Sequence, residues 1–280
     1  MKPLYPSRDE RELNGAFRRG SGKVRDNCRM PALDFGYPWW LSYGHLAIAA
    51  PTLGLLLLGY RRLWPKWALG ALSLIALWAG VVFLLIQFGL GINTASSLPT
   101  EAFLHSGTGR VLDIGAGTGR SSIMVLTARP KVTLVASDLF GDSFDHHFGH
   151  GENPQAPLLK NLRAAGVAGR AKVEQADMRK LPFEAASFDA IVSAYAVDHL
   201  NREGIAAALR EAARVVKPGG EFLLMLVGND RWAKLAFGPL LTHGGTRGKA
   251  WWRGQMQEAG FQVVEDGTTP GTLYLLARRP

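Results

Sequence analysis

The sequence predicts an α/β fold with a doubly wound, mainly parallel sheet, preceded by a transmembrane helical hairpin. Two long uncharged apolar runs, 41–60 and 67–90, predict the hairpin. From residue 110 onward, short apolar runs alternate with helical patterns, as in sheets whose parallel strands are joined by helices. The first of these runs stops in a glycine-rich turn, residues 115–119, which indicates a nucleotide-type cofactor site at the start of a helix.

The chain divides into three expected parts: a basic segment 1–38, the membrane hairpin 39–92 and a catalytic domain 93–280. Residues 1–38 are polar and rich in glycine and arginine, without a sustained apolar period, so we expect them to be largely disordered. A transit peptide would be poor in acids, and this segment contains Asp9, Glu10, Glu12 and Asp26.

The formal net charge of +9 is spread evenly, because each of the three parts carries +3. No part is therefore a polycation of the kind that binds nucleic acid, and the excess fits attraction to an anionic membrane surface. Cys28 is the only cysteine, which excludes intramolecular disulfides and cysteine-based metal sites.

The first apolar run, 41–60, contains no formal charge, and a helix of this length reaches about 30 Å, the thickness of the hydrocarbon core. The second run, 67–90, is long enough to span with some tilt. Aromatic residues mark the expected interfaces, at Tyr37, Trp39, Trp40, Tyr60, Trp64 and Trp67. The alternatives are a buried hairpin of a soluble protein and a secretory signal, and the second long run argues against the signal.

Strands and helices are expected in alternation after residue 93. Short branched apolar runs predict strands at 110–114, 131–137, 171–175, 187–193, 221–227, 261–265 and 272–277. Helical spacing and stop signals predict helices at 94–105, 121–128, 157–165, 205–215 and 251–259. The last two strands are expected to form a closing hairpin.

The glycine turn distinguishes between kinds of cofactor. A dinucleotide fingerprint, G-x-G-x-x-G, requires glycine at position 120, which is Arg120 here. The pattern is instead G-x-G-x-G with an acid two residues before it, and it resembles the first motif of class I S-adenosylmethionine (SAM)-dependent methyltransferases. The resemblance implies SAM as the cofactor, held against Asp113, Gly115, Ala116, Gly117 and Gly119.

Asp138 ends the second expected strand, about 20 residues beyond the glycines, where an acid is placed to hold ribose hydroxyls. We therefore assign Asp138 and the following Leu139 to the cofactor site. The alternative for Asp138 is a solvated turn aspartate.

Two further features resemble the same family. Asp177 and Met178 follow the third strand and match positions at which an acid accepts from the adenine amine and its neighbour packs on the ring. The residues Ser-Phe-Asp at 187–189 match the usual entry into the fourth strand. That strand ends at Ser193, which we add to the cofactor site.

The third match is the sequence of residues 209–220, which resembles a motif that precedes the fifth strand in this family. The resemblance covers roughly residues 95–280 and is greatest to the small-molecule and quinone-type branch. It implies a Rossmann-like, seven-stranded sheet of order 3-2-1-4-5-7-6, with the last strand antiparallel.

Methyl transfer from a sulfonium is a single in-line displacement, so the enzyme mainly has to orient donor and acceptor. A general base is needed only where the acceptor loses a proton, and an amine acceptor needs none. The candidates just past the fourth strand are Tyr195, Asp198 and His199. His199 is the best of them because its unperturbed pKa lies near neutrality. Alternatively, Asp198 and His199 only orient the helix start or the cofactor.

Two segments of the catalytic domain are expected to be variable. The loop 140–153 contains histidines and aspartates that are competent metal ligands, but we interpret it as a flexible substrate-side loop and predict no metal site. The aromatic and basic segment 229–253 is expected to form a lid that leans on lipid headgroups.

These features predict a membrane-anchored methyltransferase that moves the SAM methyl group to a small or lipid-like acceptor, such as a quinone precursor or a phospholipid amine. We expect contact with membrane lipids through residues 41–90 and no binding of nucleic acid. One alternative is a soluble acceptor, with the anchor used for complex assembly. Another is a non-catalytic SAM-binding module. A dehydrogenase is disfavoured by Arg120 in the glycine turn.

The basic residues give conflicting signals for topology. Arg61, Arg62 and Lys66 would place the turn of the hairpin in the cytoplasm, whereas the cluster within residues 18–29 would place the N-terminus there. We expect the N-terminus inside, in a bacterial inner membrane. Two crossings then leave residues 93–280 in the cytosol, where SAM is made.

Overall fold

The computed structural model describes residues 33–90, 94–141, 153–228, 231, 234–235, 238 and 247–280. The expected disorder of residues 1–32 lies outside the described residues. So do the histidines of the loop 140–153 and much of the expected lid.

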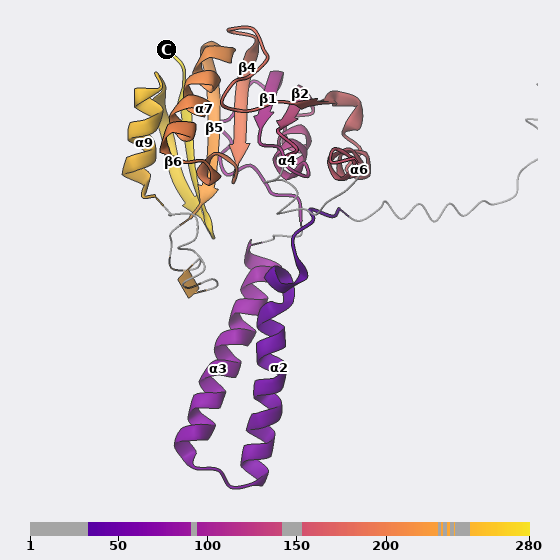
Figure 1. Cartoon of the computed structure of the whole chain (residues 1–280), viewed down its shortest axis with the longest axis vertical. Helices are drawn as coiled ribbons and strands as arrows, with labels where there is room; N and C mark the ends of the chain where they lie inside the picture. Colours follow the sequence, from indigo (N-terminus) through magenta and orange to yellow (C-terminus); the bar gives the residue numbers. More distant parts are fainter. Residues whose placement is uncertain are drawn as a thin grey trace, which may run out of the picture. The chain divides into compact units, whose positions relative to one another are not determined.

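The catalytic part contains a seven-stranded sheet of order β3-β2-β1-β4-β5-β7-β6, which confirms the predicted fold (Figure 1). The strands are β1 (Thr108–Ile114), β2 (Lys131–Asp138), β3 (Ala171–Gln175), β4 (Phe188–Ala194), β5 (Val216–Val227), β6 (Gln262–Thr269) and β7 (Thr272–Arg278). β1 to β5 are parallel to one another, and β7 is antiparallel to both β5 and β6. The strand order reverses at β1, whose neighbours are β2 and β4.

The described residues include the helices α2 (Trp39–Arg61) and α3 (Lys66–Leu84) of the hairpin, and α4 (Arg120–Ala128), α6 (Ala156–Ala164), α7 (Arg202–Val215) and α9 (Lys249–Glu258) beside the sheet. Local sequence explains the boundaries of α7. Asn201 caps its N-terminus by accepting a hydrogen bond from the Gly204 amide at 2.8 Å. Its apolar positions Ile205, Leu209 and Ala212 recur at helical spacing and are all fully buried.

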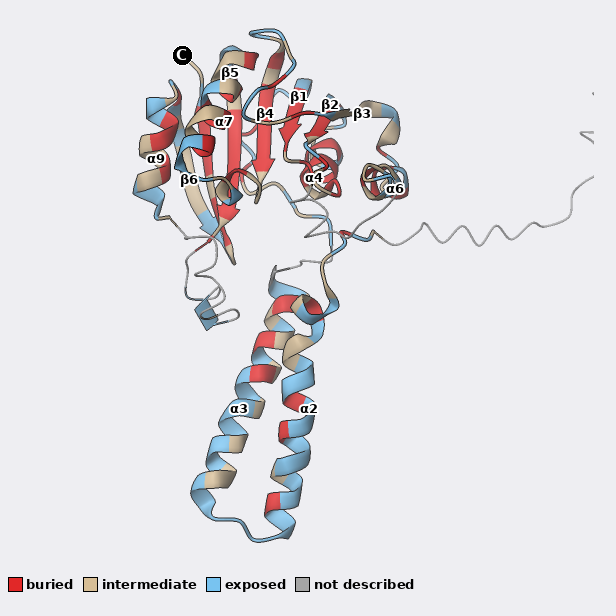
Figure 2. Cartoon of the chain, in the orientation of Figure 1, coloured by how far each residue is buried: buried red, intermediate tan, exposed pale blue. Residues whose placement is uncertain are grey.

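The sheet is covered on both faces, and its central strands are mostly buried: Val111–Ile114 of β1 and Ala190–Ser193 of β4 are all buried (Figure 2). Neighbouring residues of a strand point to opposite faces, so Val111 and Leu112 of β1 belong to different core clusters. Val111 packs in the cluster that holds Ile123 of α4 and Leu158 of α6, whereas Leu112 lies with residues of α7 and α9. This double cover explains why the strands read as apolar runs rather than as alternating patterns.

The N-terminal hairpin consists of α2 and α3, which lie side by side (Figure 1). A π-helical segment, η1 (Leu85–Leu90), extends α3. Gln87 of η1 donates a hydrogen bond from Nε2 to the Ser42 carbonyl oxygen of α2 at 2.8 Å, which joins the two helices at this end. Most of their large apolar side chains are exposed; Leu57, Leu74 and Leu77 are each more than 60% accessible.

Residues 94–105, expected to form a helix, are not helical, so that prediction is wrong. Pro99 lacks the amide hydrogen that a helix interior requires. The backbone hydrogen-bonds to side chains instead: the Leu104 amide donates to Glu221 at 2.7 Å, and the Ala102 amide donates to Thr100 Oγ1 at 3.1 Å. This linker therefore runs from the hairpin to β1 as turns and extended chain.

Residues 33–38 belong to the segment that we expected to be disordered, yet the described part of it packs on the catalytic core. Phe35 is buried in the same cluster as Val111. Its carbonyl oxygen accepts a hydrogen bond from Thr118 Oγ1 in the glycine turn at 3.0 Å. The sequence offered no signal for this contact, because a single phenylalanine in a polar segment has no period.

Candidate functional site

The glycine turn joins β1 to α4 at the carboxyl end of β1, where the strand order reverses. Open α/β sheets bind ligands at this place. Gly115, Gly117 and Gly119 all have positive φ angles, of 74°, 53° and 94°. These are backbone conformations that glycine adopts at little cost. The amides of Gly115 and Ala116 both donate to the Ser137 carbonyl oxygen of β2, at 2.8 and 3.0 Å, which fixes the turn against the neighbouring strand.

Gly115 lies where three segments converge. A Cβ atom built at Gly115 would come within 2.3 Å of the Ala196 Cβ atom, after β4, and within 3.0 Å of the Met178 Cε atom, after β3. The ends of β1, β3 and β4 therefore come together at a backbone position that has no room for a side chain. Gly119 is equally restricted, since its Cβ would lie 2.5 Å from the Leu158 Cδ1 atom of α6.

Asp138 lies beside the glycine turn, at the end of β2. Its Oδ2 accepts from the Gly117 amide at 2.9 Å, and its Oδ1 accepts from the Phe140 amide at 3.1 Å. A carboxylate offers about four acceptor positions, so capacity remains for two hydroxyl groups of a ligand. The adjacent Leu139 is 47% exposed and presents an apolar surface at the same edge.

Asp113 is fully buried beneath the turn. Its Oδ2 accepts hydrogen bonds from Ser121 and Ser122 at the start of α4, at 2.7 and 2.5 Å. Among the described residues, its Oδ1 has no hydrogen-bond partner. Burial raises the pKa of Asp113 to about 7; the two serine hydroxyls oppose this rise and the nearby charge of Asp138 adds to it. The buried carboxylate of Asp113 therefore joins the end of β1 to the start of α4.

The other two predicted cofactor contacts are engaged within the protein. Asp177 receives hydrogen bonds from the Arg179 backbone amide and guanidinium, at 2.7–3.1 Å, and these bonds lower the pKa of its carboxyl group. An adenine amine would share these acceptors with Arg179. Ser193 is fully buried and donates to the Ile114 carbonyl oxygen at 2.8 Å, so its hydroxyl joins β4 to β1.

The three candidate bases follow β4 and differ in their surroundings. His199 ends the short helix η3 (Val197–His199) and its side chain is exposed. Burial raises the pKa of Asp198, and its Oδ1 is buried without a hydrogen-bond partner among the described residues. Burial also raises the pKa of Tyr195, so its hydroxyl is protonated at neutral pH and can donate a hydrogen bond.

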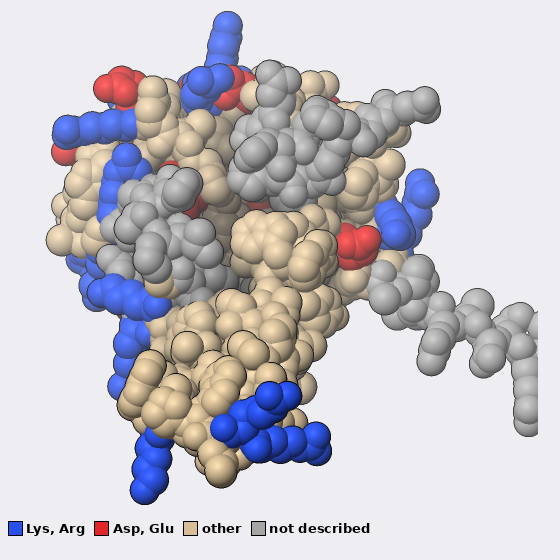
Figure 3. All heavy atoms as spheres, turned by 60° about the horizontal axis from the view of Figure 1, so that its bottom comes forward, with Lys and Arg blue, Asp and Glu red and all other residues tan. Residues whose placement is uncertain are grey.

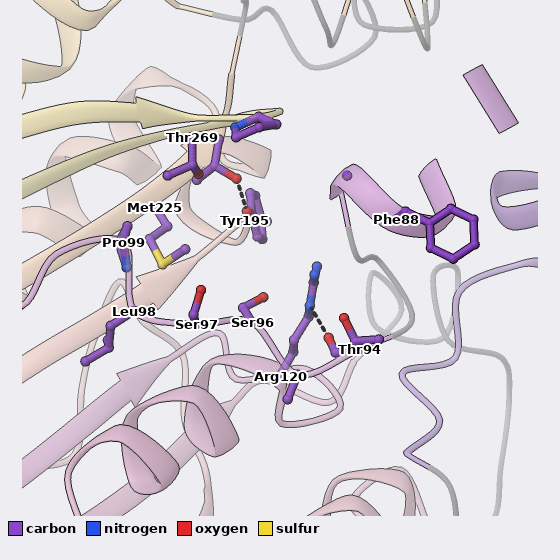
Figure 4. Close-up of a pocket in the computed structure, with 14 residues that line it drawn as sticks. Phe88, Thr94, Ser96, Ser97, Leu98, Pro99, Arg120, Tyr195, Met225 and Thr269 are labelled. Carbon is purple, nitrogen blue, oxygen red and sulfur yellow. Dashed lines mark hydrogen bonds between the residues drawn. The ribbon is translucent and has the colours of Figure 1, made fainter. Parts of the chain in front are cut away.

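A pocket of about 460 Å³ opens beside the glycine turn, and Tyr195 is the only one of the three candidates that lines it. Tyr195 reaches it from the end of β4 and Met225 from β5 (Figure 4). Thr272 of β7 also lines it. The linker 94–99 forms another wall, and Phe88 and Gly89 of the hairpin also line the pocket, as do Arg120, Thr269 and Pro270. The pocket therefore joins the carboxyl ends of the central strands to the end of the apolar hairpin.

Sequence reasoning missed several pocket residues. Arg120 was interpreted only as the absence of a glycine, although its place directly after the G-x-G-x-G pattern puts it at the edge of any ligand there. Thr272 and the hydroxyl-rich linker were missed because their position depends on strand pairing and on a linker that we expected to be helical. No group of three or more His, Cys, Asp or Glu side chains within the described ranges could hold a metal ion.

Residues 111–220 match a protein family described as "Methyltransferase domain". An uncharacterised protein of Haemophilus influenzae is 34% identical over 138 residues, which cover 45% of this chain and 51% of that protein. A ubiquinone/menaquinone biosynthesis C-methyltransferase of Syntrophotalea carbinolica is 30% identical over 141 residues, which cover 50% of this chain and 53% of the relative. The chain thus spans about half the length of the curated relatives it matches.

Among solved structures, an O-methyltransferase family protein from Burkholderia thailandensis shares 19% sequence identity with a TM-score of 0.54. The alignment covers 85% of this chain and 71% of that one. At this identity the similarity concerns the fold alone, and it agrees with the observed strand order.

Proposed function

We propose that this chain, which carries a class I SAM-dependent methyltransferase domain and uses SAM as its cofactor, is a membrane-anchored enzyme that methylates a lipid-like acceptor. The observation that carries the proposal is the pocket, which is lined by Tyr195 and Met225 of the catalytic sheet and by Phe88 of the apolar hairpin. An acceptor with an apolar tail could reach it from the bilayer without crossing water.

The geometry of the hairpin supports membrane anchoring. The helices Trp39–Arg61 and Lys66–Gly89 contain 23 and 24 residues and are long and apolar enough to cross a membrane. Only 17% of each apolar window is buried, whereas the core helix of a soluble protein would be mostly buried. Trp39 and Trp40 lie at one end, and Trp64 and Trp67 at the other, as expected at two membrane interfaces.

The topology belongs to the same proposal. Arg61, Arg62 and Lys66 form an exposed basic tip on the hairpin (Figure 3). A basic tip favours the cytoplasm for the turn itself, whereas SAM supply favours the cytoplasm for residues 93–280. We propose that the need for cytosolic SAM determines the topology, so that both ends of the hairpin lie in the cytoplasm. A reporter that is active only in the cytoplasm, fused to the C-terminus, tests this, and a full-length but inactive fusion would contradict it.

The residues of the turn fit SAM. Gly115 lets the ends of β1, β3 and β4 approach one another beside the turn, and Asp138 retains acceptor capacity for the two ribose hydroxyls. Met178 lies beside this surface, where it can pack on the adenine ring. When bound, SAM supplies a methyl group already activated on a sulfonium.

The protein therefore has to orient the acceptor and the methyl donor, and it does not have to activate the methyl group. Aligning the acceptor with the methyl group and excluding water can lower the barrier by about 7–11 kcal/mol. We propose that Tyr195, which lines the pocket, hydrogen-bonds the acceptor as a donor rather than acting as a base, which its raised pKa supports. We propose an in-line displacement in which the side chains of the pocket hold the acceptor still.

The acceptor that we favour is a quinone precursor. The support is the 30% identity to a ubiquinone/menaquinone biosynthesis C-methyltransferase, together with a pocket beside an apolar hairpin. The remaining alternatives are a soluble acceptor, with the hairpin used for complex assembly, and a SAM-binding module without catalysis.

The test uses the full chain in lipid nanodiscs with radiolabelled SAM and two hydroquinones that share one head group, one with an isoprenoid tail and one without. We expect the label in the tailed product and a lower KM for it. Equal KM values would favour the soluble acceptor, and SAM binding without release of S-adenosylhomocysteine would favour the non-catalytic module. Gly117→Val is the inactive control, because a β-branched residue is strained at a φ of 53°.

A further inference from the structure

The segment 33–38, which we call the strap, leads directly into α2 of the hairpin and contacts the glycine turn. Phe35 of the strap is 3% exposed and packs in the core cluster that contains residues of β1 and α4. Its carbonyl oxygen accepts a hydrogen bond from Thr118 Oγ1 at 3.0 Å. Thr118 is itself only 4% exposed, so this bond is shielded from water.

Asn161 of α6 joins the strap to the same residue of the turn. Its Nδ2 donates to the carbonyl oxygens of Asp34 and Thr118, at 2.7 and 2.9 Å, and its Oδ1 accepts from the Asp34 amide at 3.0 Å. Thr118 is therefore held through its side chain by the strap, and through its backbone by a side chain that also binds the strap.

The strap contacts the second half of the glycine turn. The first half, residues 115–117, is hydrogen-bonded to β2. Thr118 lies between Gly117 and Gly119, which have φ angles of 53° and 94°. Glycine loses more backbone freedom than any other residue when its conformation is fixed. A contact that fixes Thr118 therefore preorganises the turn for a ligand and lowers the entropy lost on binding.

The segment that follows the hairpin contacts the same region. The Thr94 carbonyl oxygen accepts from Arg120 Nε at 3.3 Å, two residues beyond Thr118 (Figure 4). Gln87 of η1 is hydrogen-bonded to the Ser42 carbonyl oxygen of α2, which joins the two helices near these contacts. The chain segments before and after the hairpin therefore both bind the junction between the glycine turn and α4.

We propose that Thr118 is a positioning residue of the SAM site and that the strap holds it in the conformation that binds SAM. Docking of the strap and binding of SAM then favour each other, each by the same factor. The strap continues into α2 at Trp39, so the segment that precedes the proposed anchor also supports the cofactor site. The inference requires SAM as the cofactor and does not depend on the acceptor.

Affinity for SAM tests the role of the Thr118 hydroxyl in the full chain in lipid nanodiscs. Thr118→Val keeps a β-branched side chain but removes the donor to the Phe35 carbonyl oxygen. Titration calorimetry should show a dissociation constant for SAM that is about five- to tenfold higher. Thr118→Ser keeps the hydroxyl and should stay within about twofold of the wild type. Thr133→Val is the matched control, because Thr133 is exposed on β2, and it should leave the affinity unchanged.

Hydrogen exchange followed by mass spectrometry tests the same linkage from the strap. The Asp34 amide is hydrogen-bonded to Asn161, so exchange in a peptide that covers 33–38 reports release of the strap. Saturating SAM should slow this exchange about five- to tenfold in the wild type, because the linkage is reciprocal. In Thr118→Val the slowing should be less than about twofold. A peptide that covers 272–278 of β7 reports the stability of the whole fold.

Phe35→Ala is the second variant, in case Thr118→Val does not fold, because it weakens the strap and leaves the sequence of the turn intact. It should speed exchange in 33–38 and weaken SAM binding. A released strap with unchanged SAM affinity would overturn the proposal. Equal weakening by Thr118→Val and Thr118→Ser would also overturn it, and so would equal protection of the 33–38 and 272–278 peptides by SAM. Both measurements omit the acceptor, so they distinguish this proposal from the lipid-like substrate.

Discussion

The carboxylate of Asp138 accepts a hydrogen bond from the Gly117 amide, with 2.9 Å between Oδ2 and N. This contact joins the end of β2 to the middle of the glycine turn. Asp138 therefore shapes the turn, and we propose that its remaining acceptor positions hold the ribose of the cofactor.

Asp138→Ala should weaken SAM binding by about 1–3 kcal/mol, since it removes acceptors in a partly buried site and leaves the Gly117 amide without its partner. Titration calorimetry with SAM measures the loss. Asp138→Asn is the matched control, because its amide oxygen can still accept from Gly117 but offers fewer acceptors to the ribose. Unchanged affinity in Asp138→Ala would remove Asp138 from the cofactor site.

Gly115→Ala should abolish measurable SAM binding and lower the melting temperature. Its Cβ atom would lie 2.3 Å from the Ala196 Cβ atom, and its φ of 74° is strained for alanine, at a cost of about 1–3 kcal/mol for the backbone alone. Gly169→Ala is the control, because nothing lies within 4 Å of its Cβ position. Similar SAM affinities for the two variants would show that SAM binding does not depend on the backbone conformation and close packing at Gly115.

Asp113 should make the stability of the fold depend on pH. Its pKa is raised from 3.8 to about 7, so the folded state holds the proton more tightly than the unfolded state. The stabilisation that protonated Asp113 contributes to the fold is fully present below about pH 4 and is lost as the pH rises through 7. Between pH 5 and pH 8 the loss is on the order of 2–3 kcal/mol.

Asp113→Asn removes this ionisation while its amide oxygen can still accept from Ser121 or Ser122. Chemical denaturation of both proteins at pH 5 and pH 8 should show the wild type losing stability relative to the variant at the higher pH. A constant difference between the two proteins would mean that Asp113 does not titrate in this range.

Tyr195→Phe should lower methyl transfer more than His199→Ala does. Tyr195 lines the pocket and hydrogen-bonds to Thr272, whereas His199 is exposed and outside the described lining. Both variants should bind SAM as the wild type does. Single-turnover rates at saturating acceptor measure the difference. A larger loss in His199→Ala, with a changed pH profile, would restore His199 as the general base.

Asn161→Ala should destabilise the fold and release residues 33–38. Asn161 is fully buried, and its Nδ2 donates to the carbonyl oxygens of Asp34 and Thr118 at 2.7 and 2.9 Å. Each buried partner left unsatisfied costs about 1–3 kcal/mol. Thermal melting and limited proteolysis at residues 33–38 measure the effect. Lys160→Ala, at an exposed position on α6, should change neither readout.

The sequence by itself determined the strands, the glycine turn and the kind of cofactor. These features are local: a buried strand reads as an apolar run, and a backbone that approaches a ligand needs glycine. Asp113, Asp138 and Met178 were assigned because each directly precedes or follows such a feature. The strand order followed from the resemblance to a family, and the structure has that order.

Only the tertiary structure decided which side chains meet. Arg120, Tyr195 and Thr272 are far apart in sequence and share a pocket because β4, β5 and β7 are adjacent in the sheet. The segment 94–105 is not helical, and Thr100 and Leu104 within it donate hydrogen bonds to Glu265 and Glu221, which lie on distant strands. Long-range strand pairing and packing set these contacts, and the order of residues along the chain does not encode them.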